Sequence, residues 1–486
     1  MKKFIALIII IIVILTACQN GSDNDKTSET KNNSDETQGI NETEILPVLP
    51  EDADYEGYEF RVVTRGDERH NYPLHTRDIY ADEQNGESIN DAVYLRNRTV
   101  EDLFNVQIVM YALNEDDSLA PNTAVERAVL ADEDLYDLLM THEIFAAPTA
   151  QNGYLMNLAY VSYIDLSKPW WDKSATNDLS VGNKIFLALS DFSVSSNDHA
   201  IIFLFNKELH TDYELENFYE LVSTNKWTFD KMHEIIKYVK ADLNGDGQMT
   251  EEDLYGFISG DLAMGFYYSG GNTLTKKDAD NIPYYDILNE RSILTYEKTL
   301  AINSDDHTYA FIAGWEDKKI IPMFANGNGL LLMTQIGIIQ QLRNMEIDFG
   351  LLPVPKLNEQ QEKYLLNIDG HAQLMAIPIT VRETEKVGAI LEALSYYSHK
   401  YLVPAYYDVN LKTKFSRDNE SSEMLDIIMD GRIFDFGYVY DNWVIAFQFQ
   451  YLIREKAINY VSKIESLLPT AEAQLKKILD AYDAIE

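Results

Sequence analysis

Apolar and polar residues follow two alternating patterns along the first half of the folded chain. Short runs rich in Val, Ile, Leu and Tyr predict strands at residues 58–64, 106–112 and 135–141. The segments 89–104 and 122–131 between them carry apolar residues at helical spacing. Strands separated by helices with short connections predict a mainly parallel sheet covered by helices. In the first helix we expect Ser88 as the N-cap and a buried face formed by Ile89, Val93, Val100, Leu103 and Phe104.

The same patterns continue to the C-terminus without internal repeats. Further strands are predicted at 185–190, 200–205, 348–353 and 373–379. Further helices are predicted at 228–240, 382–399 and 470–484, the last beginning at Thr470 after Pro469. The prediction is an α/β fold in two lobes.

The N-terminus carries an export signal. Lys2 and Lys3 precede 12 apolar residues, Phe4–Leu15, whereas a membrane-spanning helix needs about 20. Leu15-Thr16-Ala17-Cys18 resembles a bacterial lipobox, which implies a signal peptide at 1–17 and a lipid on Cys18. A lipid there would anchor the chain to the outer face of a membrane, in a bacterium of Gram-positive type. The alternative is an ordinary signal peptide with an incidental cysteine.

Composition restricts the remaining possibilities. Residues 18–54 are mostly polar and predict a disordered linker ahead of the folded body. The net charge of −39 repels phosphate backbones, so we expect no nucleic-acid partner. Cys18 is the only cysteine, which excludes disulfides within the mature chain. We expect a monomer.

One segment has the spacing of a calcium loop. Asp242, Asn244 and Asp246 offer side-chain oxygens at positions 1, 3 and 5, and Gly247 stands at the sharp turn. The remaining ligands would be the carbonyl oxygen of Gln248 at position 7 and Asp253 at position 12, where Glu is usual. We expect a structural Ca²⁺; the alternative is an Asx-rich turn that binds nothing.

Several segments resemble, in order, those of a known protein family. They are residues 184–189, 201–209, 225–230, 324–333, 347–355 and 371–378. In these segments the chain resembles the extracellular solute-binding proteins of ABC importers, in the sugar-binding branch that includes maltose-binding protein. The resemblance implies two α/β lobes, 55–192 with 376–417 and 193–375 with 418–486, that close on a solute. It also implies docking on a membrane permease.

A sugar site needs flat apolar faces for the ring and planar polar groups for the hydroxyls. Trp170, Trp171 and Asp172 offer both in one polar segment, and His142 and Glu143 end a predicted strand. Ser195 and Asp198 lie between two predicted crossing strands, and Asp369 and His371 precede the predicted return strand. The family resemblance adds Tyr267, Tyr268, Asp441 and Trp443. For each of these residues the alternative is a core position, a turn or a solvated loop.

Other functions are less well supported by the motifs. The chain contains no G-x-S-x-G turn, no H-E-x-x-H helix and no cysteine available as a nucleophile. Paired carboxylates cannot be ruled out by counting in a chain with 79 acidic residues, so a glycan-active enzyme stays an alternative. A surface sensor or adhesin with the same fold is the other. The sequence favours a non-enzymatic solute receptor.

Overall fold

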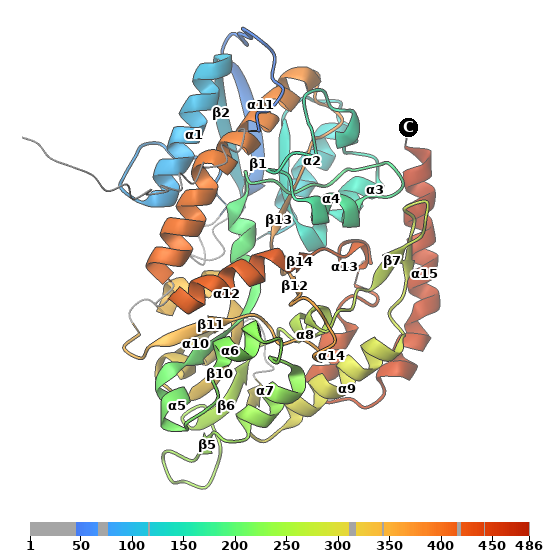
Figure 1. Cartoon of the computed structure of the whole chain (residues 1–486). Coiled ribbons are helices and arrows are strands. Elements are labelled where there is room, and N and C mark those ends of the chain that lie inside the picture. The colour runs from blue at the N-terminus through green and yellow to red at the C-terminus, as the bar shows by residue number, and fades with distance from the viewer. Residues whose placement is uncertain are drawn as a thin grey trace, which may run out of the picture. The chain divides into compact units, whose positions relative to one another are not determined.

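Two larger sheets, and the segments that pass between them, organise the chain (Figure 1). The computed structural model describes residues 45–66, 76–114, 117–310, 317–342, 345–415, 419–441 and 443–485. The predicted signal peptide, Cys18 and most of the predicted linker lie outside these residues. Residues 46–486 form one compact unit. Its first ordered residues already contribute to the fold, because Leu49 and Ala53, inside the predicted linker, pack against a core cluster.

The first sheet has the strand order β13-β3-β1-β2. Its parallel strands are β1 (Tyr58–Arg65), β2 (Val106–Leu113) and β3 (Leu138–His142), and β13 (Gln373–Ala376) pairs with β3 in the antiparallel direction. Its helices are α1 (Ser88–Phe104), α2 (Ala120–Leu130) and α11 (Thr384–Tyr397). Two details of α1 were predicted wrongly. Glu87, not Ser88, precedes its first turn, and the Leu103 side chain is 43% exposed.

The second sheet has the order β11-β4-β10-β6-β5, with β9 also paired to β6. Its strands are β4 (Ile201–Asn206), β5 (Lys240–Ala241), β6 (Leu254–Ser259), β9 (Thr308–Ala310), β10 (Gly329–Gln335) and β11 (Phe349–Leu352). The surrounding helices include α5 (Lys207–Asp212), α6 (Phe218–Ser223), α7 (Phe229–Ile236), α8 (Met264–Ser269), α9 (Glu290–Ser304) and α10 (Asp317–Ala325). β4 is fully buried and antiparallel to both neighbours, β10 and β11.

Three segments connect the two sheets. The 3₁₀ helix η3 (Val194–His199) leads into β4, and residues 368–372 lead from β12 (Leu366–Asn367) into β13. The π-helical turns η5 (Ser398–Leu402) and η6 (Ala405–Phe415) follow α11 and lead toward α12 (Asn419–Asp430), which packs on β11. Two α/β halves joined by crossing segments confirm the predicted fold class.

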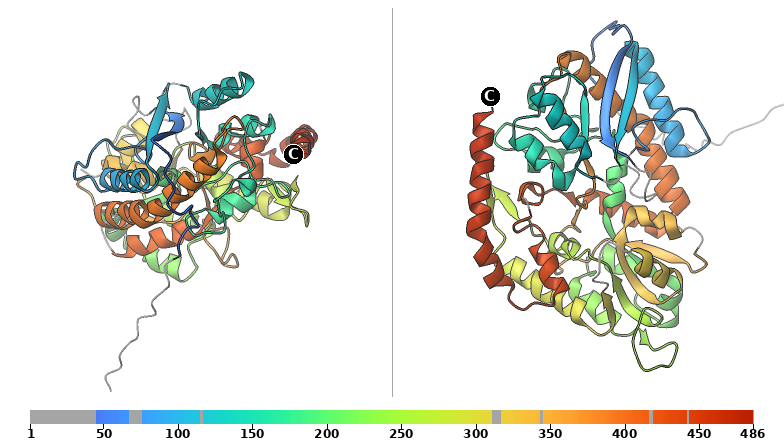
Figure 2. Two further views of the ribbon diagram at one scale, coloured as in Figure 1. Left: turned by 90° about the horizontal axis from the view of Figure 1, so that it is seen from above. Right: turned by 180° about the vertical axis from the view of Figure 1, so that it is seen from behind.

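The C-terminal part packs around the junction of the two sheets. It contains β14 (Arg432–Ile433), α13 (Phe436–Tyr440), α14 (Gln448–Arg454) and α15 (Tyr460–Ala484). α15 runs beside the hairpin of β7 (Thr275–Lys277) and β8 (Pro283–Tyr285), as Figure 2 shows from behind. Its predicted start at Thr470 was wrong, because the helix begins at Tyr460 and holds Pro469 inside it. Among the described residues, no helix is both long enough and apolar enough to cross a bilayer.

The predicted strand at 185–190 is reduced to isolated pairings. Ala188 pairs with Met375 and Ser190 with Trp171, each as a single bridge. The segment still extends the first sheet beside β13, because the Ala188 and Met375 backbones exchange hydrogen bonds of 3.1 and 2.9 Å.

Candidate functional site

Two segments predicted to bind solute meet at the end of β3. His142 ends the strand and Glu143 opens the 3₁₀ turn η1 (Glu143–Phe145). The Glu143 backbone N–H donates to the Ala372 carbonyl at 2.9 Å, and the Ile144 N–H donates to the Gly370 carbonyl at 3.2 Å. The carboxyl end of a parallel strand is where α/β folds place their ligand crevice. The structure therefore brings 142–145 and 369–372 together at such a position.

Imidazole and carboxylate groups converge there. The His371 ring lies 5.5 Å from that of His142 and 6.4 Å from that of His199, between centroids. Its Nδ1 lies 2.6 Å from the Asp369 carboxylate. Burial alone would raise the pKa of Asp369, but His371 more than offsets this and lowers it. Burial lowers the pKa of His199 to about 3, so that ring is neutral.

Glu143 is the least satisfied group of this cluster. Its side chain is 2% exposed, and no described residue hydrogen-bonds its Oε2. Burial, together with the negative charges of Asp369 and Asp435, raises the pKa of Glu143 well above its usual value. A buried oxygen without a partner costs about 1–3 kcal/mol. Glu143 therefore has hydrogen-bonding capacity that a solute hydroxyl could use.

Aromatic rings border the same cluster. The Phe145 ring stacks on that of Trp443 at 6.3 Å, and Trp443 lies 4.7 Å from Phe447. Trp443 is 45% exposed and has a φ of 68°, a left-handed conformation that is uncommon outside glycine. The Tyr438 hydroxyl accepts a 3.2 Å hydrogen bond from the Gly370 N–H, which ties α13 to the crossing segment. Trp443 thus presents a partly exposed indole ring next to the segment 142–145.

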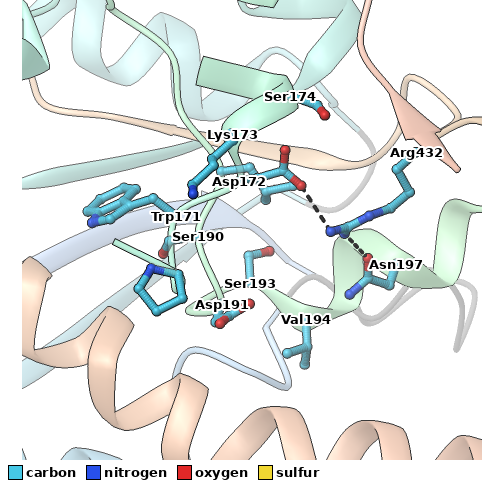
Figure 3. Close-up of a pocket in the computed structure, with 12 residues that line it drawn as sticks. Trp171, Asp172, Lys173, Ser174, Ser190, Asp191, Ser193, Val194, Asn197 and Arg432 are labelled. Atoms are coloured by element: carbon cyan, nitrogen blue, oxygen red, sulfur yellow. Dashed lines mark hydrogen bonds and ion pairs between the residues drawn. The ribbon is translucent and has the colours of Figure 1, made fainter. Parts of the chain in front are cut away.

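A cavity of about 390 Å³ lies beside η3, and Val194 and Asn197 of η3 line it (Figure 3). Arg432 of β14 crosses its wall: one guanidinium nitrogen lies 3.0 Å from the Asp172 carboxylate, and another donates to the Asn197 amide oxygen at 2.6 Å. Trp171 and Lys173 also line the cavity. η3 joins the two regions, because Asn197 lies at the cavity and His199 at the carboxylate cluster.

The tryptophan pair does not form an open floor. The Trp170 and Trp171 side chains are only 1% and 2% exposed and belong to the core of the first sheet. Both indole N–H groups donate to Glu392 of α11, at 3.0 and 2.9 Å. This buried acceptor explains how two indoles in a polar segment can lie in the core. Trp171 also lines the cavity, whereas Trp170 takes the alternative of a core position.

Five other predicted site residues have structural partners. The Ser195 N–H donates to Asp78 at 2.8 Å, and Asp198 pairs with Arg77 at 2.6 Å. Tyr267 and Tyr268 are fully buried on α8, where their hydroxyls donate to the Thr273 carbonyl and to Asp435. Asp441 accepts from the Tyr285 hydroxyl and from the Ile445 and Ala446 N–H groups. These contacts give all five a role in the framework behind the site.

Four contributors were not among the predicted site residues: Phe145, His199, Tyr438 and Arg432. Phe145 and His199 lie within three residues of predicted positions, so extending those motifs would have found them. Tyr438 likewise lies three residues before the predicted Asp441, whereas Arg432 lies in a stretch that carries no motif, and only tertiary contact reveals it.

The predicted calcium loop has the turns that such a site requires. Asp242 accepts from the Gly245 and Gly247 N–H groups at 2.7 and 2.8 Å, and both glycines have positive φ. Asp253 is buried and accepts from the Leu243 and Thr250 N–H groups. Among the described residues, only Asp305, Asp306 and His307 bring three acidic or imidazole ligand atoms within 4.8 Å of one another. The backbone thus fits a bound ion, but the carboxylates of the loop would have to draw closer.

No family model matches the chain, and no curated protein matches its sequence. Its fold matches the ABC substrate-binding protein Lmo0181 from Listeria monocytogenes in complex with cycloalternan, with a TM-score of 0.53, 13% identity, and coverage of 87% of this chain and 99% of that one. It also matches the maltose/maltodextrin-binding domain MalE from Bdellovibrio bacteriovorus bound to maltotriose, with a TM-score of 0.54 and 13% identity. This match covers 86% of this chain and 100% of that one. A third match is UgpB from Mycobacterium tuberculosis in complex with glycerophosphocholine, with a TM-score of 0.54 and 14% identity. This match covers 81% of this chain and 95% of that one. At these identities the likeness concerns the fold.

Proposed function

We propose that this chain, which has the two-lobed fold of MalE-like solute-binding proteins, binds a sugar or oligosaccharide where its two sheets meet. The observation that carries the proposal is that Glu143, a buried carboxyl with an unpartnered Oε2, lies two residues from Phe145, whose ring stacks on the partly exposed indole of Trp443. Sugars need both a hydrogen-bonding partner and a flat apolar face. The sugar complexes among the matched folds support the same ligand class.

The setting of this receptor follows from the N-terminal sequence and the fold. We propose that Cys18 carries a lipid that holds a monomeric receptor at the outer face of the cell membrane. The lobes would comprise 55–192 with 376–417 and 193–375 with 418–486. Closure of the lobes on the solute would create the surface that an ABC permease recognises. The protein would then bind the solute and deliver it to the permease, and would catalyse no reaction.

The first test is a glycan panel read by thermal shift, followed by calorimetry. We expect at least one sugar to raise the melting temperature and Trp443→Ala to weaken its binding by about 10- to 100-fold, because ring stacking contributes about 1–3 kcal/mol. Tyr160→Ala is the matched control, since Tyr160 is 79% exposed and lies outside the site. A shift with peptides or polyamines and none with any sugar would overturn the ligand class.

We further propose that the loop from Asp242 to Asp253 holds a structural Ca²⁺. Asp242, Asn244, Asp246 and Asp253 would supply side-chain oxygens and Gln248 a carbonyl oxygen. Ca²⁺ at about 100 times its Kd should stabilise the protein by about 2.7 kcal/mol, and EDTA should remove that gain. Asp246→Ala should abolish the Ca²⁺-dependent rise in melting temperature. Asp212→Ala, at an exposed aspartate on α5, should retain it; an unchanged response in Asp246→Ala would refute the site.

A further inference from the structure

We propose that the cavity beside Arg432 receives the anionic group of an acidic sugar, such as a carboxylate or sulfate. This inference rests on the proposed sugar-binding function and narrows its ligand class. It follows from which hydrogen-bonding groups on the cavity wall are already occupied and which are not.

The acidic groups of the cavity are occupied by the protein itself. One Asp172 oxygen accepts from the Ala175 N–H at 2.9 Å, and the other pairs with Arg432 at 3.0 Å. Asp191 pairs with His399, whose Nδ1 lies 2.6 Å away. Each of the two carboxylates on the wall therefore already has a basic partner within the protein.

The donors of the same cavity are only partly used. Among the described residues, no hydrogen bond or ion pair involves the exposed Lys173 ammonium. The Arg432 guanidinium carries five N–H groups, of which the contacts with Asp172 and Asn197 account for two. The Asn197 oxygen is taken by Arg432, which leaves the amide N–H groups of Asn197 available. Spare donors from three side chains thus lie around one cavity of about 390 Å³.

The cavity wall has unused N–H groups, and its two carboxylates are already paired with basic side chains. Such a wall favours a ligand that is rich in hydrogen-bond acceptors. A sugar hydroxyl both donates and accepts hydrogen bonds, whereas a carboxylate or sulfate only accepts them. Charge-assisted hydrogen bonds from Arg and Lys are the stronger kind. The excess of unused donors on this wall is important because the net charge of the chain, −39, would otherwise repel an anionic solute.

The test compares matched sugars by calorimetry on the full mature protein. A uronate disaccharide and a sulfated disaccharide are titrated beside the neutral disaccharide of the same linkage. We expect one of the acidic sugars to bind at least about 10-fold more tightly than the neutral one, with an advantage that shrinks as salt rises. The acidic sugar that binds more tightly identifies the anionic group.

Two variants assign the effect to the cavity. Arg432→Gln should cost the acidic sugar about 10- to 100-fold in affinity and the neutral sugar much less. Because Arg432→Gln also removes the partner of Asp172, Lys173→Met provides a variant with no internal partner to lose, and should cost about 3- to 10-fold. Lys226→Met, at an exposed lysine of the second sheet's surface, is the matched control.

Each outcome separates this inference from the function on which it rests. Equal or tighter binding of the neutral sugar, or an unchanged preference in both Arg432→Gln and Lys173→Met, would overturn the acidic-sugar inference and leave the receptor function standing. Absence of binding to any sugar would overturn the proposed function itself.

Discussion

Glu392→Ala is expected to lower the free energy of unfolding by about 4 kcal/mol. The Glu392 carboxylate is fully buried and accepts the indole N–H groups of both Trp170 and Trp171. Its removal leaves two buried donors unpaired, at about 1–3 kcal/mol each, and opens a cavity in the core of the first sheet. Urea denaturation followed by tryptophan fluorescence measures the loss.

A double-mutant cycle tests whether the indoles cause the effect. Adding Trp170→Phe and Trp171→Phe to Glu392→Ala removes the donors as well, so the triple variant should lose less than the sum of the separate changes. Strict additivity would mean that Glu392 acts through packing alone.

The same residue should make stability depend on pH. Burial raises the pKa of Glu392 from 4.5 to about 7, although both indoles favour the charged form. Between these values the folded state binds a proton that the unfolded state has lost, so stability falls as pH rises through this window. The full contribution is about 3 kcal/mol. Glu392→Gln should flatten this part of the pH profile of melting temperature, and an unchanged profile would contradict the assignment.

Asp435→Ala is expected to destabilise the protein by about 3–5 kcal/mol and to abolish solute binding. The Asp435 carboxylate accepts from five donors: the Tyr268 hydroxyl, the Leu274 N–H, the Thr275 N–H and hydroxyl, and the Gly437 N–H. It thereby joins α8 and the start of β7 to α13, whose Tyr438 contacts Gly370. Several of these donors would be left buried without an acceptor.

Chemical denaturation and the glycan titration measure the two effects separately. Asp435→Asn keeps the size of the side chain and one oxygen, so it should fall between wild type and alanine. Asp280→Ala, at an exposed aspartate of the β7–β8 turn, should change neither quantity. Intact binding in a stable Asp435→Ala protein would contradict the role of Asp435 as the support of the site.

Local pattern was sufficient for the parallel strands of the first sheet, but it missed β6 and β10 of the second sheet and was insufficient for the site. The run 58–64 and the segment 89–104 carry their own periodicity, so the strand and helix could be predicted without tertiary information. Trp170 was a candidate site residue because it lies in a polar segment. Its acceptor, Glu392, is 222 residues away in the sequence, and no local pattern indicates that the two groups meet.

The same limit explains the misplaced helix start. Pro469 ordinarily marks the first turn of a helix, but in α15 it lies within a continuous helix of 25 residues. The helix continues through Pro469 while α15 packs against β8 and α9, and local sequence does not encode these contacts.

The short helix η3 has a consequence for how such a receptor would respond. One turn of backbone bears Asn197 at the cavity and His199 beside the carboxylate cluster, and it is also one of the links between the two halves. If the two halves close on a ligand, as we propose, a ligand that contacts either side chain would act directly on this link. Ligand recognition and movement of the two halves would then depend on the same segment, η3. We therefore expect a substitution in η3 that changes one to change the other as well.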